Sequence, residues 1–223
     1  MFEEVQRVSD GMIVEIREYL DFLSTHNPSG LSAIPRFIDT GKGLLYVQLY
    51  GVIESTVIRT LSRTLDYINE DQTKLSQLKL VILSLALNDE LDAIIDSNTK
   101  KWDKRYDLFR KIDLDEVAKI NNALMPTDGK NIGSKQLSSI FKIFQIDVPF
   151  FHEPSFQGRL TDIVHNRINI AHGNSTSSQI GRSLTIADLN QRIDEVSAFC
   201  SYFISTFDDY VKAKKYLIVQ QTI

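Results

Sequence analysis

The segment from Arg159 to Asn174 brings together polar and ionisable side chains suited to proton transfer and phosphate binding. Placed on a helix at about 100° per residue, the segment divides into an apolar side and an adjacent polar stripe. The apolar side contains Leu160, Ile163, Val164, Ile170 and Ala171, with Ile168 at its edge, and the polar stripe contains Thr161, His165, Asn169 and His172, with Asp162 and Asn166 beyond it. Arg167 breaks this division because it projects into the middle of the apolar side.

An arginine in that position needs a charged partner or a route to solvent, because a buried and unpaired guanidinium is strongly destabilising. Glu54 is a matching anomaly in an expected second helix, where it lies in line with Tyr50 and Leu61 on the stripe that should face the core. We therefore hypothesise a contact between Arg167 and Glu54, with their charged groups within about 4 Å. The alternative is a buried ion pair that is structural only.

Arg167 and His172 together could act on a phosphodiester. They are five residues apart, so their Cα vectors diverge by about 140°, but a long arginine side chain can still bring its guanidinium near the imidazole. An arginine can donate two hydrogen bonds to phosphate oxygens, and histidine side chains can exchange protons near neutral pH. Asn169 lies close by in the sequence. The alternative for His172 is a helix-terminal residue that interacts with the last carbonyl groups.

Several other kinds of site are absent from the sequence. It contains no GxxxxGK[ST] phosphate loop and no GxGxxG, HExxH or GxSxG motif. The single cysteine, Cys200, excludes a disulfide framework and a cysteine-based zinc site. A metal site built from His165 and Asp162 has too few ligands to be favoured. We therefore expect neither a metal nor another cofactor.

The composition sets outer limits on the function. The 223 residues include 25 basic and 29 acidic side chains, for a formal net charge of -4, and 43% are hydrophobic. This length fits one large domain or two small ones. The acidic balance excludes a nucleic-acid coat held by bulk positive charge, but not a local basic site. Without a secretory signal or an apolar run of roughly 20 residues, we expect a cytoplasmic protein with no membrane partner.

Apolar residues recur at helical spacing along most of the chain, and strand-like alternation is nearly absent. Helices are expected at about 2–23, 44–68, 74–95, 135–146, 156–172 and 185–211, the last beginning with a capping box at Thr185 and Asp188. Pro35, Gly41 and Gly43 predict a loop before the second helix. The segment 96–133 predicts a less regular insertion with a short helix at 114–124. The expected fold is therefore all-α, a single helical domain over 1–223, with Phe199, Phe203 and Phe207 in its core rather than on a dimer surface.

Arg167-Ile-Asn-Ile-Ala-His172, followed by Gly-Asn, is an R-x4-H motif near the end of a helix. This motif resembles the signature of the HEPN superfamily (higher eukaryotes and prokaryotes nucleotide-binding). Two further stretches, Ile16-Arg-Glu-Tyr-Leu-Asp-Phe-Leu23 and Leu45-Tyr-Val-Gln-Leu-Tyr-Gly-Val-Ile-Glu-Ser-Thr-Val57, are similar to a bacterial HEPN branch named for MAE_28990 and MAE_18760. The resemblance covers the first two helices, the motif helix and the final helix, and it leaves about 96–133 uncovered.

The resemblance implies an HEPN-like helical bundle that forms a homodimer in which two motif helices meet. Two copies of Arg167 and two of His172 would then form one composite site for an RNA substrate. Many such proteins are metal-independent endoribonucleases of toxin–antitoxin, phage-defence or CRISPR-associated systems, so a cognate antitoxin or defence-system protein is an expected partner. His172 would move a proton to or from the 2′-oxygen or the leaving 5′-oxygen, and Arg167 would hold the scissile phosphate.

Ile168 departs from the family pattern, in which Asn, Asp or His often follows the arginine. Asn169 is therefore expected to orient the histidine, with Asn166 as the alternative, and His165 and Glu54 take supporting positions. Basic residues near the motif that could contact RNA are Arg159, Lys135 and Arg182. Two other hypotheses stay open: a non-catalytic HEPN partner or neutralising subunit, and a helical interaction module in which Arg167 and Glu54 are structural only.

Overall fold

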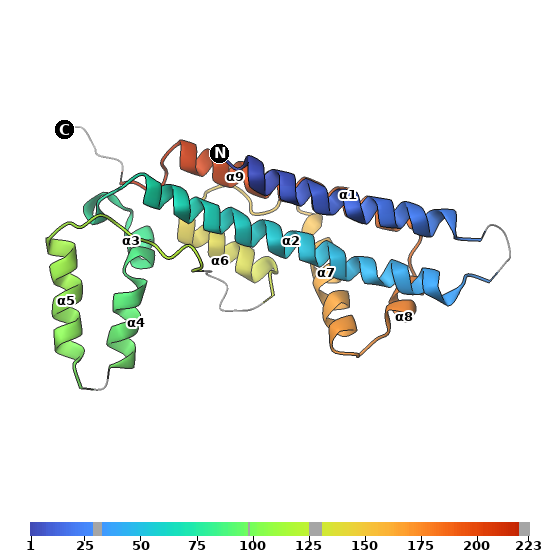
Figure 1. The fold of residues 1–223 in the computed structure, drawn as a ribbon, viewed down its shortest axis with the longest axis horizontal. Helices are drawn as coiled ribbons and strands as arrows, with labels where there is room; N and C mark the ends of the chain where they lie inside the picture. Colours follow the sequence, from blue (N-terminus) through green and yellow to red (C-terminus); the bar gives the residue numbers. More distant parts are fainter. Residues whose placement is uncertain (29–32, 98, 125–130, 219–223) are drawn as a thin grey trace.

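The computed structural model describes residues 1–28, 33–97, 99–124 and 131–218. Within these ranges the chain forms helices joined by turns and loops, with two isolated β-bridges and no strand, so the predicted all-α class is confirmed. The helices are α1 (Glu3–Thr25), α2 (Arg36–Glu70), α3 (Leu80–Ala86), α4 (Asn88–Asp96), α5 (Lys101–Asp113), α6 (Ser134–Phe144), α7 (Phe156–Ala171), α8 (Ser177–Arg182) and α9 (Ile186–Lys212), and a short 3-10 helix spans Leu75–Gln77. In Figure 1, α1, α2 and α9 lie lengthwise together, and the α4–α5 hairpin projects from one end.

The core lies between α1, α2 and α9 and extends to α6 and α7. On α1 the buried apolar residues follow the spacing of one helix face: Val5, Ile13, Ile16, Leu20 and Leu23. On α9, Phe199, Phe203 and Phe207 are fully buried, which confirms their predicted place in the core. The Phe141 ring of α6 packs against Phe203 and Phe207, with ring centroids 6.0 and 6.1 Å apart. This aromatic contact fixes α6 against the bundle.

The predicted start of α9 is confirmed. The Thr185 hydroxyl accepts the Asp188 N–H at 3.0 Å, and Asp188 Oδ2 accepts the Thr185 N–H at 3.0 Å. These two bonds satisfy backbone donors that a helix start leaves free. The capping box therefore places the first turn of α9 directly after α8.

The predicted loop around Gly41 and Gly43 is wrong, because α2 already begins at Arg36. Both glycines have poor intrinsic helix propensity, but the absence of a side chain allows another helix to pack closely against α2 at these positions. A Cβ at Gly43 would lie 2.0 Å from the Ser177 carbonyl oxygen, and a Cβ at Gly181 would lie 1.8 Å from the Asp39 carbonyl oxygen. The backbones of α2 and α8 therefore touch, and packing overrides propensity at this point.

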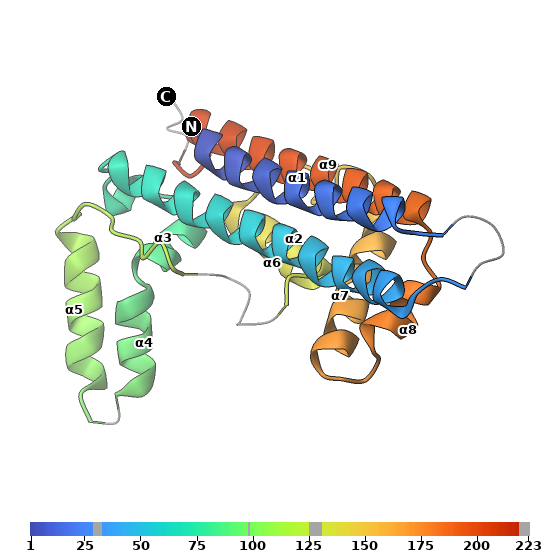
Figure 2. The ribbon, with the colours of Figure 1, turned by 45° about the vertical axis from the view of Figure 1, so that its right-hand side comes forward.

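Two further segment predictions need correction. The helix predicted at 74–95 is divided into the short 3-10 helix, α3 and α4. Within the predicted irregular insertion, residues 101–113 form α5, whereas 114–124 do not form a helix and 125–130 lie outside the described residues. α4 and α5 form a hairpin that projects from the bundle in both Figures 1 and 2. The insertion is therefore an arm with its own regular structure.

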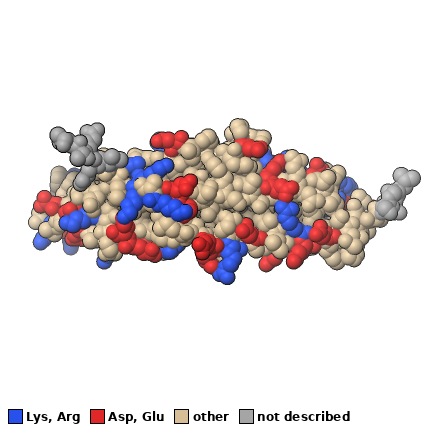
Figure 3. Space-filling model, turned by 90° about the horizontal axis from the view of Figure 1, so that it is seen from above, with Lys and Arg blue, Asp and Glu red and all other residues tan. Residues whose placement is uncertain are grey.

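The side of the bundle formed by α1 and α9 carries interspersed charges rather than one basic surface (Figure 3). An ion pair of 2.6 Å between Arg17 and Asp194 links the two helices there. Within the described ranges, no helix combines the length and the apolarity needed to cross a membrane.

Cys200 is enclosed on α9, where its side chain is 1% exposed. Burial raises the pKa of the thiol to about 11, although the nearby Thr56 and Ser9 hydroxyls oppose the shift. Because the thiolate is the reactive form of cysteine, this thiol is inert in the folded protein.

Candidate functional site at the end of α7

α7 holds the motif residues and is anchored at its start by buried Phe156, Leu160 and Ile163. It ends at Ala171, and the His172 N–H closes the last turn by donating to the Ile168 carbonyl at 3.0 Å. Gly173 follows with φ +71°, a conformation that glycine adopts without strain. His172 is exposed, and within the described residues its side chain has no hydrogen-bond partner. The imidazole is therefore accessible at the tip of the motif helix.

Arg167 is half-buried between α7 and α2. Its guanidinium carbon lies 4.7 Å from the centre of the Tyr50 ring, a distance typical of a cation–π contact. Its Nη1 donates to Asn131 Oδ1 at 3.3 Å. Among the described residues no carboxylate lies within 4.0 Å of this guanidinium. The arginine is thus held by an aromatic ring and an amide, with donors left over.

The predicted direct contact between Arg167 and Glu54 is wrong, and Tyr50 mediates between them. The Tyr50 hydroxyl donates to Glu54 Oε1 at 2.9 Å and accepts the Ile132 N–H at 3.0 Å. Burial raises the pKa of Tyr50 to about 12; the Ile132 N–H opposes the shift and Glu54 adds to it. Glu54 therefore fixes the ring on which Arg167 lies, and the sequence could not distinguish this from an ion pair because both residues share one stripe of α2.

The other predicted site residues separate into two local pairs. Asn169 Nδ2 lies 2.8 Å from His165 Nε2, one turn earlier on α7. Asn166 Nδ2 donates to Asp162 Oδ1 at 2.8 Å. Within the described residues neither asparagine bonds to His172. In the single chain, the amide expected to orient His172 is therefore engaged elsewhere.

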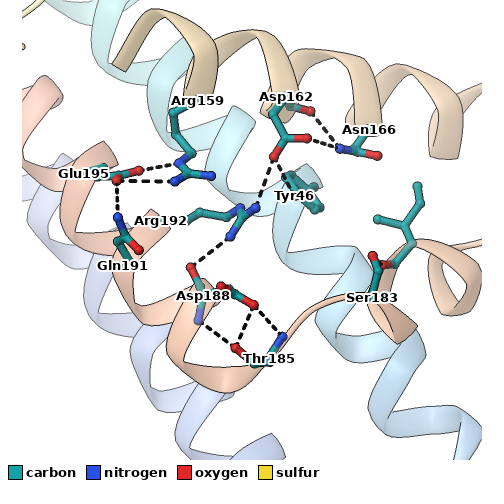
Figure 4. A network of polar contacts seen from close by, with 11 residues as sticks. Tyr46, Arg159, Asp162, Asn166, Ser183, Thr185, Asp188, Gln191, Arg192 and Glu195 are labelled. Atoms are coloured by element: carbon teal, nitrogen blue, oxygen red, sulfur yellow. Dashed lines mark hydrogen bonds and ion pairs between the residues drawn. The ribbon is translucent and has the colours of Figure 1, made fainter. Parts of the chain in front are cut away.

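A second polar cluster, missed by the sequence reasoning, joins α7 to α2 and α9 (Figure 4). The Tyr46 hydroxyl donates to Asp162 Oδ2 at 2.7 Å, and Arg192 lies 3.4 Å from the same oxygen and 5.6 Å from the centre of the Tyr46 ring. Burial, followed by the hydrogen bond to Asp162, raises the pKa of Tyr46 to about 12, while Arg192 opposes the shift. Tyr46 and Tyr50 are one helical turn apart, and that spacing was the available sequence signal.

Of the basic residues expected to contact RNA, two already have acidic partners. Arg159 Nε lies 2.5 Å from Glu195 Oε2, and Figure 4 shows the pair within the second cluster. Arg182 Nε lies 3.9 Å from Asp39, which also pairs with buried Lys42 at 2.9 Å. Lys135 is exposed and has no ion-pair partner among the described residues. Of these three residues, Lys135 is therefore the one that no acidic side chain of the described ranges neutralises.

α8 fixes the chain that follows His172. Its backbone contacts α2 at Gly43 and Gly181, and Lys42 donates to the Leu184 carbonyl at 3.0 Å beneath it. The Thr176 hydroxyl accepts the Gln179 N–H at 3.3 Å and caps α8. Both ends of the 172–176 turn are therefore anchored.

Within the described ranges, His, Cys, Asp and Glu side chains form no group of three or more that could hold a metal ion. The chemistry that this arrangement can perform with its own side chains is phosphate binding by Arg167 and proton transfer by His172. In the part of the chain that the structure describes, no further ionisable side chain hydrogen-bonds to His172.

A comparison with known families bears on this arrangement. The family model described as MAE_28990/-like HEPN matches residues 8–216, which includes the motif helix, the arm and α9. No curated protein and no solved structure shows significant similarity to the chain. Because the match covers most of the chain, the protein belongs to the MAE_28990/-like HEPN family.

Proposed function

We propose that the protein is a homodimeric, metal-independent endoribonuclease whose site is formed by Arg167 and His172 of both copies. The observation that carries this proposal is the environment of Arg167. The Tyr50 ring and Asn131 hold its guanidinium, and within the described residues no carboxylate neutralises it. A positioned guanidinium with free donors is suited to a phosphate group. HEPN family membership supports an RNA-related role.

Cleavage begins at the RNA 2′-hydroxyl. One His172 takes its proton while the 2′-oxygen attacks the adjacent phosphorus, so a bond to the 2′-oxygen forms as the bond to the 5′-oxygen breaks. The second His172, in its protonated form, gives a proton to the leaving 5′-oxygen. The two Arg167 side chains stabilise the negative charge on the phosphate oxygens. The products are a 2′,3′-cyclic phosphate and a 5′-hydroxyl, and DNA is not cut because it lacks the nucleophile.

The decisive experiment is incubation of the purified protein with mixed RNA in EDTA, next to Arg167→Ala and His172→Ala. Each substitution is expected to lower the cleavage rate by about 100-fold or more. The matched control is His26→Ala, because His26 also ends a helix and is exposed, but lies on α1. Cleavage that survives both motif substitutions, requires magnesium, or acts on 2′-deoxy RNA analogues would contradict the mechanism.

A mixing experiment tests the composite site separately. An excess of the double variant Arg167→Ala/His172→Ala is mixed with the wild-type chain and allowed to exchange subunits, so that most wild-type chains lie in mixed dimers with a single Arg167 and a single His172. Because the mechanism uses both copies of His172, cleavage per wild-type chain is expected to fall strongly. Unchanged cleavage per wild-type chain, together with proof of subunit exchange, would show that each chain acts alone.

We place this activity in a toxin–antitoxin or phage-defence type system, acting on cytoplasmic RNA. Expression of the wild-type chain is then expected to arrest growth, whereas His172→Ala at equal expression is not. A cognate antitoxin would relieve the arrest by binding the wild-type protein. Equal growth of cells expressing either chain would contradict the toxin or defence role. The cleavage mechanism would still be tested by the RNA incubation in vitro.

The alternative function is a non-catalytic HEPN partner or neutralising subunit acting by protein–protein contact. Its support is the environment of the two asparagines: Asn169 pairs with His165, Asn166 pairs with Asp162, and Ile168 follows the arginine. No polar side chain of the described residues orients His172 in the single chain. If the wild-type protein leaves RNA intact with and without magnesium, this alternative is preferred.

A further inference from the structure

α5 presents three aromatic side chains to solvent on one face. Trp102 is 77% exposed, and Tyr106 and Phe109 are each 64% exposed. At 100° per residue, the three positions fall within an arc of about 60°. Leu108 is the one buried residue of α5. Aromatic surface of this extent and regularity is typical of a binding face rather than of solvated surface.

Two arginines flank these aromatic rings. Arg105 lies beside Trp102, with its guanidinium carbon 4.7 Å from the ring centre, and Arg110 lies along the opposite edge. Both are exposed, and neither has an ion-pair partner within 4.0 Å among the described residues. We name Trp102, Tyr106, Phe109, Arg105 and Arg110 together the α5 aromatic face.

The acidic groups of the arm lie largely off this face. Lys111 turns toward α4 and pairs with Glu90 at 2.5 Å. Asp103 and Asp107 lie about 20° and 60° beyond Arg110 around the helix, and Asp113 lies on the face itself, one turn after Phe109 at the helix end. A ligand on the aromatic rings therefore meets arginine on both sides.

We propose that the α5 aromatic face binds single-stranded RNA, with bases stacked on the aromatic rings and phosphates at Arg105 and Arg110. This inference rests on the proposed function for the identity of the nucleic acid. Stacked aromatic rings with flanking arginines are how proteins hold unpaired bases without reading sequence. An apolar protein partner would have to desolvate both arginines without offering them an anion, whereas a ribose–phosphate backbone supplies one to each.

The arm and the motif helix project to the same side of α2. In Figures 1 and 2 the α4–α5 hairpin and the end of α7 lie toward the two ends of α2, with α4 between α5 and α7. Lys111 pairs with Glu90 of α4 and lies opposite the aromatic rings around α5, so the α5 aromatic face points away from α7. A strand bound there reaches His172 by passing around the arm. The arm is then expected to increase the cleavage of long RNA and to leave the cleavage of very short RNA unchanged.

Trp102 provides a direct readout because it is the only tryptophan of the chain. The experiment titrates full-length His172→Ala protein with an unstructured single-stranded RNA of about 16 nucleotides, the upper site size of single-strand-binding folds. Stacking is expected to quench tryptophan fluorescence. In this background, Tyr106→Ala or Phe109→Ala should weaken the measured affinity by about 5- to 150-fold. The matched control is Phe22→Ala, which removes a 51% exposed aromatic from α1 and should change nothing.

Salt dependence tests the arginines. Replacing both Arg105 and Arg110 by Gln should reduce the slope of log affinity against log salt by about 1.4, since each phosphate contact on single strands contributes about 0.7. An unchanged slope would show that Arg105 and Arg110 do not contact the phosphates. Circular dichroism of each variant excludes loss of the helix as the cause of weaker binding.

Two outcomes would overturn the proposal. One is binding of RNA without quenching and without any effect of the aromatic substitutions. The other is that Trp102→Ala abolishes self-association in sedimentation while RNA affinity stays unchanged, which would make the face a protein interface. Failure of the proposed function is distinguishable: quenching by RNA in His172→Ala with no cleavage by wild type would retain RNA binding and reject the ribonuclease.

Discussion

Tyr46 and Tyr50, one turn apart on α2, each lie beneath an arginine. Over Tyr46, Arg192 is 13% exposed and is engaged by Asp162 and by the Asp188 carbonyl at 3.1 Å. Over Tyr50, Arg167 has Asn131 as its hydrogen-bond partner, and no carboxylate of the described residues reaches it. Stacking is common to both, but the first arginine is neutralised within the fold and the second is left able to bind an anion. A positioned arginine therefore indicates a binding function only when no carboxylate of the fold already pairs with it.

The largest expected effect separates the two arginines by activity. Arg167→Met should lower the rate of RNA cleavage by about 100-fold or more, because it removes the positive charge that stabilises the phosphate. Arg192→Met should leave turnover per folded molecule within about threefold, because the second cluster lies away from the reacting atoms. The measurement is the initial rate of RNA cleavage, normalised to folded protein. Equal losses of cleavage rate in both variants would show that the absence of a carboxylate beside Arg167 does not mark it as the phosphate-binding arginine.

The next effect reverses the order and concerns stability. Arg192→Met should lower the free energy of unfolding by about 1–2 kcal/mol, because the largely buried Arg192 loses its bonds to Asp162 and to the Asp188 carbonyl. Arg167→Met should cost less than about 1 kcal/mol, the scale of a cation–π contact at a partly exposed site. Urea unfolding of both variants provides the measurement. A larger loss for Arg167→Met would make that residue the structural member of the pair.

The two tyrosines should destabilise the protein in alkaline solution. The folded-state pKa of each is about 12 against an ordinary value of 10.0, so the unfolded chain loses its phenol protons first as pH rises. The stability from the neutral phenols is complete below pH 10 and is lost between about pH 10 and 12, by about 1.4 kcal/mol per tyrosine at pH 11. Urea unfolding at pH 8 and pH 11 measures it. Tyr50→Phe and Tyr46→Phe should each flatten this pH dependence, and an unchanged slope in either variant would contradict the assignment.

The smallest effect tests the role of Glu54. Glu54→Gln keeps an acceptor for the Tyr50 hydroxyl, so stability should change by less than about 1 kcal/mol and the cleavage rate by only a few-fold. Glu54→Leu removes the acceptor and provides the matched contrast. A large loss in Glu54→Gln would show that Arg167 depends on the charge of Glu54 and not on the placement of the Tyr50 ring.

Sequence patterns were sufficient for the class of fold and for the unusual position of Arg167. Helical periodicity and the Thr185 capping box depend on residues close together in the sequence, so the sequence predicts them. The sequence did not predict the partners of Arg167, because Asn131 comes from a distant loop and Tyr50 lies on the same side of α2 as Glu54. The sequence placed the start of α2 too late because glycine has a low helix propensity. At Gly43 the close contact with α8 requires a glycine within the helix, and this contact is not visible in the sequence.

The arm was missed for a different reason. α5 buries little beyond Leu108, so its apolar pattern is too weak to predict a helix from periodicity. Its charges did carry a signal: Asp103 lies in the first turn and Arg110 and Lys111 in the last, which complements the helix dipole. The exposed aromatic residues in between are better explained by a ligand than by the core.

The enclosed thiol of Cys200 makes the chain a natural background for site-specific labelling. Since the only native cysteine does not react in the folded state, a cysteine introduced at Asn174, beside His172, would be the single point of attack for a maleimide. A short bismaleimide would then join two chains only where their motif helices meet. The geometry of the shared site can be measured in this way even with a variant that cuts no RNA.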